Sequence, residues 1–301
     1  MVSATGLSKS GAPCSSFALA DPVELFRPGL RQGQVTNILT IDVEDWYHCL
    51  DENPDRWSEY EDRIVSQVGR ILDILAETGT KATFFVLGHV AQAHPDMVRQ
   101  IFDIGHEVAS HGFEHRFIYQ QAESEFEADV RRSVSLLEQI IGTPVLGYRA
   151  PYFSVTRKSL WALGALRRIG LLYDSSIFPV VNPRYGIPEA PRLPRRTREG
   201  LLELPPTTFP FAGTNVPCAG GVYFRFAPYP VIRKLFRMLN RRRERVVFYL
   251  HPWELDARQP RIALPACLKI RHYWGLDRTP KKLRRLLREF RFGAAREVLQ
   301  L

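Results

Sequence analysis

Short apolar segments typical of buried strands alternate along this chain with segments whose apolar residues recur at helical spacing. The strand-like segments are found at 38–41, 82–87, 107–109, near 145, at 201–204 and at 246–250, and the clearest helical patterns at 64–79 and 122–140. Strands that alternate with helices indicate a mostly parallel sheet. In a chain of 301 residues, this pattern favours an α/β fold in a single domain, built as a closed or a distorted barrel.

The two ends of the chain depart from this alternation. Residues 1–35 are rich in Ser, Ala, Gly and Pro without a sustained period, and we expect a flexible N-terminal extension there. The barrel is then predicted over 36–275. Residues 276–301 are predicted to form a basic amphipathic C-terminal helix with an apolar stripe made of Leu283, Leu286, Leu287 and Phe290.

The net charge of +9 is concentrated near the C-terminus, because residues 231–301 hold 19 Lys and Arg against 6 Asp and Glu. A solvated surface, an anionic membrane face and an acidic polymer all remain candidate explanations. No recognisable nucleic-acid-binding module accompanies the charge, so we do not expect nucleic acid as a partner. For the C-terminal helix, packing on the barrel and peripheral contact with an anionic membrane both stay open.

Composition and cysteine content bear on the compartment. With 45% hydrophobic and 24% charged residues, the chain has an ordinary globular composition, which argues against wholesale disorder. No apolar run approaches the ~20 residues of a membrane-spanning helix, and no secretory signal is evident at the N-terminus. We expect a cytoplasmic location, with peripheral attachment to the inner membrane as a further option. The widely spaced cysteines are expected to be free thiols: Cys14, Cys49, Cys218 and Cys267.

Polar residues follow the predicted strands at the points where these end. Asp42 follows the first strand, His111 the strand at 107–109, Arg149 the strand near 145, and His251 the last strand. The C-terminal ends of parallel barrel strands share one rim, where active sites lie. We therefore expect these four side chains to meet in one site.

A metal site is one interpretation of the histidines and acids in this set. His111 and His115 are four residues apart, a spacing at which two imidazoles can reach one divalent cation, although both could be ordinary surface residues. The carboxylates of Asp42, Glu44 and Asp45 repel one another unless a cation or an arginine offsets their negative charge. One carboxylate would complete a two-histidine-one-carboxylate site. Strand pleating puts Asp42 and Glu44 on one side, but Asp45 is not excluded.

The remaining two residues suit supporting roles in catalysis. Arg149 precedes Pro151, which stiffens the turn, and its guanidinium can bind a carboxylate at two points. His251 titrates near neutrality and suits a general acid. The alternatives are a surface arginine beside an aromatic core and a hydrogen-bonded structural histidine.

Four motifs in this order and spacing resemble the NodB-type polysaccharide deacetylases, carbohydrate esterase family four, over about residues 37–274. They are Thr40-Ile41-Asp42, Ser110-His111-(x3)-His115, Arg149-Ala150-Pro151-Tyr152 and Leu250-His251. The longer segments 42–48, 148–154, 220–225 and 249–254 resemble a bacterial subgroup that accompanies exosortase (PEP-CTERM) exopolysaccharide gene clusters.

The resemblance implies a distorted (β/α) TIM-like barrel and a metal-dependent enzyme of exopolysaccharide biosynthesis. It would remove N-acetyl groups from amino sugars of a bacterial (exo)polysaccharide or its lipid-linked precursor and release acetate. The implied cofactor is a divalent metal, usually Zn²⁺, with Co²⁺ or another divalent ion as alternatives. His111 and His115 would be ligands. The family motif has two adjacent aspartates, whereas Val43 follows Asp42 here, so the carboxylate ligand would be Glu44 or Asp45, with strand geometry favouring Glu44.

The resemblance also assigns the catalytic groups. Asp42 would be the general base and His251 the general acid. Arg149 would orient Asp42, Asp174 would orient His251, and the backbone N–H of Tyr152 would help to form the oxyanion hole.

Functions of other classes compete with this one. The segment His111–His115 also spells H-x-x-E-H, an inverted zinc-peptidase motif that requires a continuous helix and Glu114 as the base. Gly112 and the preceding strand argue against that helix. A non-catalytic glycan-binding barrel would keep the fold without the chemistry, although every residue that the reaction needs is present. A metal-independent amide hydrolase on the same fold is a third option.

Overall fold

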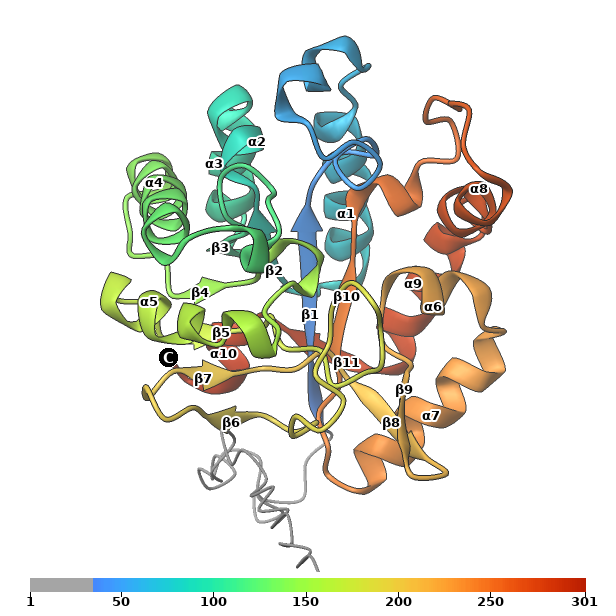
Figure 1. The fold of residues 1–301 in the computed structure, drawn as a ribbon. Coiled ribbons are helices and arrows are strands. Elements are labelled where there is room, and N and C mark those ends of the chain that lie inside the picture. Colours follow the sequence, from blue (N-terminus) through green and yellow to red (C-terminus); the bar gives the residue numbers. More distant parts are fainter. Residues whose placement is uncertain (1–34) are drawn as a thin grey trace, which may run out of the picture.

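The computed structural model describes residues 35–301, and a curled, mostly parallel sheet of nine strands forms its centre (Figure 1). The predicted extension over 1–35 lies, but for its last residue, outside the described residues. Along the sheet the order is β10-β1-β2-β3-β4-β5-β7-β6, with β11 also paired to β1, and only β6 and β7 pair antiparallel. The strands are β1 Thr36–Val43, β2 Thr83–Val86, β3 Glu107–Ser110, β4 Gly147–Tyr148, β5 Tyr173–Asp174, β6 Arg195–Arg196, β7 Leu202–Glu203, β10 Val247–Leu250 and β11 Arg291–Gly293.

The sheet curls into a half-barrel, because its two end strands, β10 and β6, are not paired with each other. Beyond β7, Leu204 donates its backbone N–H to Asp174 at 2.7 Å, and Thr207 donates to Val247 of β10 at 3.2 Å. The segment between them therefore bridges the two sides of the curled sheet. It leads into a separate hairpin of β8 (Thr208–Phe211) and β9 (Thr214–Pro217). The predicted α/β fold is confirmed, in the form of a half-barrel.

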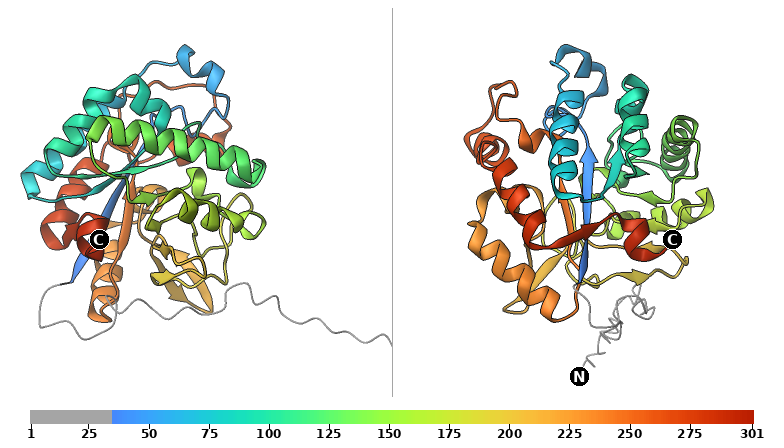
Figure 2. Two further views of the ribbon diagram at one scale, coloured as in Figure 1. Left: turned by 90° about the vertical axis from the view of Figure 1, so that its left-hand side faces the viewer. Right: turned by 180° about the vertical axis from the view of Figure 1, so that it is seen from behind.

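Helices cover the outside of the curled sheet, as the views in Figure 2 show. They are α1 Ile64–Thr78, α2 Gly88–Ala93, α3 Pro95–Asp103, α4 Glu123–Ile141, α5 Trp161–Ile169, α6 Gly221–Phe226, α7 Tyr229–Arg241, α8 Ala266–Tyr273, α9 Thr279–Glu289 and α10 Ala295–Leu299. The predicted apolar face of α1 is buried, which stabilises the fold by roughly 1.5–3 kcal/mol per large side chain. Helix α1 ends as predicted at Gly79, whose φ of 61° is a left-handed conformation that glycine adopts without strain.

The pairing of the strands puts the predicted site residues at one rim. β1 and β10 run in parallel with Ile41 opposite Leu250, so Asp42, near the end of β1, lies beside His251, which follows β10. β3 and β4 also end together, which places His111 beside Arg149. β2 lies between β1 and β3 and completes this part of the rim. The expected convergence of four strand ends is confirmed.

The C-terminal segment differs from the single helix predicted over 276–301. Helix α9 is shorter, and it is followed by β11, which pairs with β1, and by α10. The apolar stripe of α9 is buried against the barrel, and Arg284 on its outer side pairs with Glu77 of α1 at 2.7 Å. The stripe is therefore covered, and membrane contact through it is not supported. Among residues 35–301, no helix is long and apolar enough to cross a membrane.

The described cysteines are free thiols, as predicted: Cys49, Cys218 and Cys267. Cys14 lies outside the described residues.

Candidate active site

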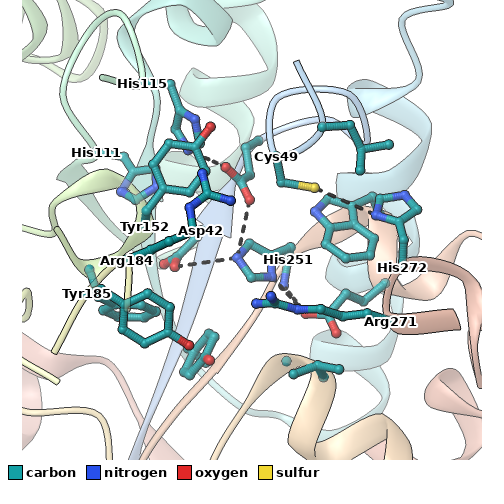
Figure 3. Close-up of a pocket in the computed structure, with 18 of the residues that line it drawn as sticks. Asp42, Cys49, His111, His115, Tyr152, Arg184, Tyr185, His251, Arg271 and His272 are labelled. Carbon is teal, nitrogen blue, oxygen red and sulfur yellow. Dashed lines mark hydrogen bonds and ion pairs between the residues drawn. The ribbon is translucent and has the colours of Figure 1, made fainter. Parts of the chain in front are cut away.

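Two histidines and one glutamate form a buried cluster at the rim. Glu44 follows β1, and His111 and His115 follow β3. One potential ligand atom from each residue lies within 4.8 Å of the others. His115 Nε2 contacts a carboxylate oxygen of Glu44, and both side chains are no more than 4% exposed. Figure 3 shows the two histidines facing the same space.

The chemistry of this cluster fits a divalent cation. Buried polar atoms are rarely left without partners, yet His115 Nδ1 has no hydrogen bond, and Glu44 Oε2 has no partner except its close contact with His115 Nε2. The Nδ1–H of His111 donates to the backbone oxygen of Arg149 at 2.8 Å, so its Nε2 is free for an ion. Two imidazoles and a carboxylate are a common ligand set for zinc that leaves coordination positions open.

The second candidate carboxylate is engaged elsewhere. Asp45 accepts hydrogen bonds from the backbone N–H of Trp46 at 2.7 Å and of Arg63 at 2.6 Å. Its own N–H donates to His48 Nδ1 at 2.7 Å. The structure therefore brings Glu44, and not Asp45, to the two histidines.

Electrostatics favour the protonation states that a metal site needs. Burial by itself would raise the pKa of Glu44, but the nearby His115 and His251 outweigh it and hold that pKa well below its usual range. Burial lowers the pKa of His111 to about 4. An ionised carboxylate and a neutral imidazole are the forms that bind metal ions.

A buried arginine holds Asp42 beside this cluster. The Arg149 guanidinium is fully buried and donates from Nη1 to Asp42 Oδ1 at 2.6 Å and to Thr40 at 2.8 Å. Its Nη2 donates to the Ser175 hydroxyl at 2.7 Å, and its Nε to the Ser175 backbone oxygen at 3.2 Å. The predicted contact of Arg149 with Asp42 is present, and the guanidinium is fixed from two sides.

The partner of His251 is not the predicted one. His251 Nδ1 lies 2.8 Å from Glu254 Oε1, and Glu254 Oε2 accepts from Arg225 Nε at 2.7 Å. The prediction that Asp174 orients this histidine is wrong. Glu254 lies three residues after His251, in the first turn of the short helix Pro252–Leu255, where its side chain can reach back. This leaves His251 Nε2 facing Glu44 at 3.2 Å and Asp42 at 3.9 Å.

Asp174 instead supports the arginine. It accepts a hydrogen bond from the Ser176 hydroxyl at 2.5 Å, and the Ser176 oxygen accepts from the backbone N–H of Ala150 at 2.8 Å. Ser175, between the two, binds Arg149. Asp174 therefore braces the segment behind Arg149.

One cavity connects these groups, and its outer wall contains residues that the sequence did not single out. Tyr152 lines it with a φ of 57°, a strained conformation for a non-glycine residue that is often found at functional sites. Its hydroxyl donates to the His48 backbone oxygen at 2.9 Å. The lining residues that the sequence analysis missed include Cys49, Asn182, Arg184, Tyr185, Arg225, Trp253, Glu254, Arg271 and His272.

A thiol in this cavity is not an activated nucleophile. Cys49 Sγ lies 3.7 Å from His272 Nδ1 (Figure 3). Burial raises the pKa of Cys49 well above its usual range, and burial lowers the pKa of His272 to about 3. The thiol is therefore protonated and the imidazole neutral, which argues against a cysteine hydrolase.

The inverted zinc-peptidase arrangement is absent. His111–His115 is not helical, because Gly112 has a φ of 73° and His115 a φ of 53°. Glu114 does not line the cavity and lies 3.8 Å from Arg116. The residue that would be the peptidase base thus lies outside the site.

Two family models match consecutive parts of the chain. Residues 46–169 match polysaccharide deacetylase, and residues 175–300 match a domain of unknown function, DUF3473. The first match includes both histidines and Arg149 and begins just after Asp42–Asp45, and the second includes Arg225, His251 and Glu254.

Curated relatives are similar over part of their length. A chitooligosaccharide deacetylase of Azorhizobium caulinodans is 32% identical over 132 residues, which are 44% of this chain and 59% of that protein. A peptidoglycan-N-acetylglucosamine deacetylase of Bacillus cereus is 31% identical over 94 residues, 31% of this chain and 34% of that protein. A peptidoglycan deacetylase-like protein of Gibberella zeae is 32% identical over 112 residues, 36% of this chain and 32% of that protein. The chain thus spans about a third of the length of two of these relatives.

Solved structures share the fold. A protein of Mycobacterium smegmatis assigned as a polysaccharide deacetylase aligns over 89% of this chain and 94% of its own, with a TM-score of 0.55 and 23% identity. The Bc1960 peptidoglycan N-acetylglucosamine deacetylase aligns over 89% of both chains, with a TM-score of 0.50 and 17% identity. Residues 46–169 are therefore similar to polysaccharide deacetylases, and the chain shares the fold of these two solved structures.

Proposed function

We propose that this protein hydrolyses the N-acetyl groups of amino sugars in a polysaccharide and releases acetate. One observation carries the proposal. Asp42, held by Arg149, and His251, held by Glu254, face the same cavity next to a buried Glu/His/His cluster, with His251 Nε2 3.9 Å from Asp42 and 3.2 Å from Glu44. A base and an acid beside a candidate metal site are the groups that amide hydrolysis requires.

Glu44, His111 and His115 would hold the divalent ion, for which we propose zinc because two imidazoles and a carboxylate suit it. Such an ion supplies Lewis acidity, which makes a water molecule nucleophilic near neutral pH and polarises the acetamide carbonyl. All three side chains are buried, and they line the cavity that a substrate would enter.

The chain's own residues would move the protons. Asp42 accepts a proton from the attacking water as the new C–O bond forms, and Arg149 keeps its carboxylate aimed at that water. The backbone N–H of Tyr152 would donate a hydrogen bond to the oxyanion. His251 then gives a proton to the sugar nitrogen as the C–N bond breaks. Acetate and a free amino sugar are the products. Each such proton transfer typically contributes ~100- to 10,000-fold in rate.

We also propose that the two matched segments form one catalytic unit. The DUF3473 segment supplies His251 and Glu254, whereas the deacetylase segment supplies His111, His115 and Arg149. Residues of both segments line the same cavity, so each segment alone would lack part of the site.

For the substrate, we propose an N-acetylated bacterial exopolysaccharide or its lipid-linked precursor, met in the cytoplasm. The motif segments around Asp42, Tyr152 and His251 support this choice through their resemblance to the exosortase-associated subgroup. The relatives from Azorhizobium and Bacillus are described as acting on chitooligosaccharides and on peptidoglycan. Chitooligosaccharides and peptidoglycan fragments are therefore the substrates against which an exopolysaccharide should be compared in activity assays.

Acetate release from N-acetylated oligosaccharides, with and without a chelator, tests this function. We expect acetate from at least one glycan class, loss of activity in chelator, and recovery when Zn²⁺ or Co²⁺ is added back. Chelator-resistant release would instead indicate a metal-independent amide hydrolase. A folded protein that releases no acetate from any exopolysaccharide, chitooligosaccharide or peptidoglycan fragment would favour a non-catalytic barrel.

Replacing Glu254 by Gln is expected to lower kcat by about 10- to 100-fold with a smaller change in KM. The neutral amide no longer balances the Arg225 guanidinium and no longer favours the Nδ1–H form of His251. Steady-state kinetics measure the effect, and imidazole ¹⁵N shifts report the tautomer of His251. An unchanged tautomer together with unchanged kcat would remove Glu254 from the mechanism.

A further inference from the structure

We propose that Arg271 binds an anionic substituent, a carboxylate or a phosphate, on the glycan that is deacetylated. This inference rests on the proposed function and adds a substrate class to it, namely an acidic N-acetylated glycan.

Helix α8 places this arginine on the wall of the catalytic cavity. Leu268, Arg271 and His272 line the cavity, and their spacing along the helix puts them on one face. Figure 3 shows Arg271 on the His251 side of the cavity, across from His111 and His115. A group bound by Arg271 would therefore belong to the same glycan as the acetamide at the metal site.

The backbone that carries Arg271 is fixed to the catalytic centre. Arg225 donates from Nη2 to the Arg271 backbone oxygen at 2.8 Å and from Nη1 to the His272 backbone oxygen at 2.9 Å. Its Nε binds Glu254, the partner of His251. The same buried arginine thus sets the position of α8 and that of the proposed general acid. Because this backbone is fixed, only the side chain of Arg271 has to be ordered when an anion binds.

Charge pairing singles out Arg271 among the cavity residues. The carboxylates that line the cavity each contact a partner already: Asp42 contacts Arg149, Glu44 contacts His115 and His251, and Glu254 contacts Arg225 and His251. Arg184, on another part of the wall, pairs with Glu52 at 2.6 Å. Within residues 35–301, no carboxylate lies within 4 Å of the Arg271 guanidinium.

The balance of charge in the cavity favours an acidic ligand. Asp42 and Glu254 are paired with Arg149 and Arg225, Glu44 with two histidines, and Arg184 with Glu52. Among the described residues this leaves Arg271 as a cavity arginine without a carboxylate partner. A divalent ion would add two positive charges, of which the oxyanion offsets only one. A neutral glycan would offer no negative charge to Arg271. A carboxylate or a phosphate would form a charge-assisted, bidentate contact with its guanidinium. Exposed arginines are common, but this one lines the reaction cavity without an acidic partner.

Acetate-release kinetics on matched saccharides test the proposal. The probes are a neutral chitotetraose, a hyaluronan tetrasaccharide that alternates N-acetylglucosamine with a uronic acid, and N-acetylglucosamine 1-phosphate. We expect Arg271→Ala to lower kcat/KM by about 10- to 100-fold on the anionic probe that the site accepts, and by less than about twofold on chitotetraose. Arg271→Lys should lose less, because lysine keeps the charge without the planar fork. Comparing the uronic-acid probe with the sugar phosphate shows whether the anion that Arg271 binds is a carboxylate or a phosphate.

Lys269→Ala is the matched control, because Lys269 is an exposed cation of the same helix that does not line the cavity. If it reproduces the loss, or if Arg271→Ala affects neutral and anionic probes equally, the subsite is refuted. Calorimetric binding to the metal-free protein separates the two proposals. Tighter binding of an anionic probe than of chitotetraose, lost in Arg271→Ala, supports the subsite even without turnover. Equal binding overturns it, while absence of acetate release speaks against the deacetylase function alone.

Discussion

Replacing Asp42 by Asn is expected to lower kcat/KM for acetate release by about 100- to 10,000-fold, the range lost with a general base. The amide has the shape of the carboxylate, and its oxygen can still accept from Arg149, whose guanidinium also binds Thr40 and Ser175. The site should therefore keep its geometry and lose only the group that takes the proton. Initial rates of acetate release, with metal content measured on the same samples, give the result.

Glu114→Ala is the control for this change. Glu114 is close in sequence to the metal cluster but does not line the cavity, so its removal should alter the rate by less than about threefold. The opposite pattern, an inactive Glu114→Ala and an active Asp42→Asn, would restore the zinc-peptidase interpretation. Equal, background-level acetate release from the wild type and from Asp42→Asn would show that the barrel binds glycans without hydrolysing them.

The sequence predicted the convergence of the site residues because strand ends are encoded locally. An apolar run followed at once by a polar residue marks the point where a parallel strand reaches the rim, and this holds for Asp42, His111 and His251. Pleating also favoured Glu44 over Asp45. Deciding between them required the turn after β1, in which Asp45 accepts from the backbone of Trp46 and Arg63.

The residue that hydrogen-bonds to His251 and orients it could not be predicted in the same way. The resemblance supplied Asp174 for this role, yet Asp174 bonds to Ser176 and braces the segment behind Arg149. Glu254 was visible three residues after His251, but its role depends on Arg225, which approaches from a helix 29 residues away in sequence. Contacts between distant segments depend on how the helices pack, and local patterns do not encode that packing.

Removal of one metal ligand, His111→Ala, is expected to weaken zinc binding by more than about 100-fold, since even the loss of an outer partner of a ligand costs 10- to 100-fold. The remaining Glu44 and His115 cannot hold an ion as three ligands do. Wild-type protein at a zinc concentration about 100 times Kd should gain about 2.7 kcal/mol of stability, or roughly 5–10 °C in Tm. The variant should show no such gain.

His94→Ala provides the matched comparison, because His94 pairs with Asp62 away from the cavity and should leave the zinc-dependent rise in Tm unchanged. Elemental analysis after dialysis gives an independent reading of metal content that does not depend on knowing the glycan. If the His111→Ala variant kept both its metal and its zinc-dependent stability, the ion would have to bind somewhere other than the Glu/His/His cluster. The close contact of Glu44 Oε2 with His115 Nε2 and the unpaired, buried His115 Nδ1 would then have to be explained without an ion. A buried polar atom without a partner destabilises the fold by roughly 1–3 kcal/mol.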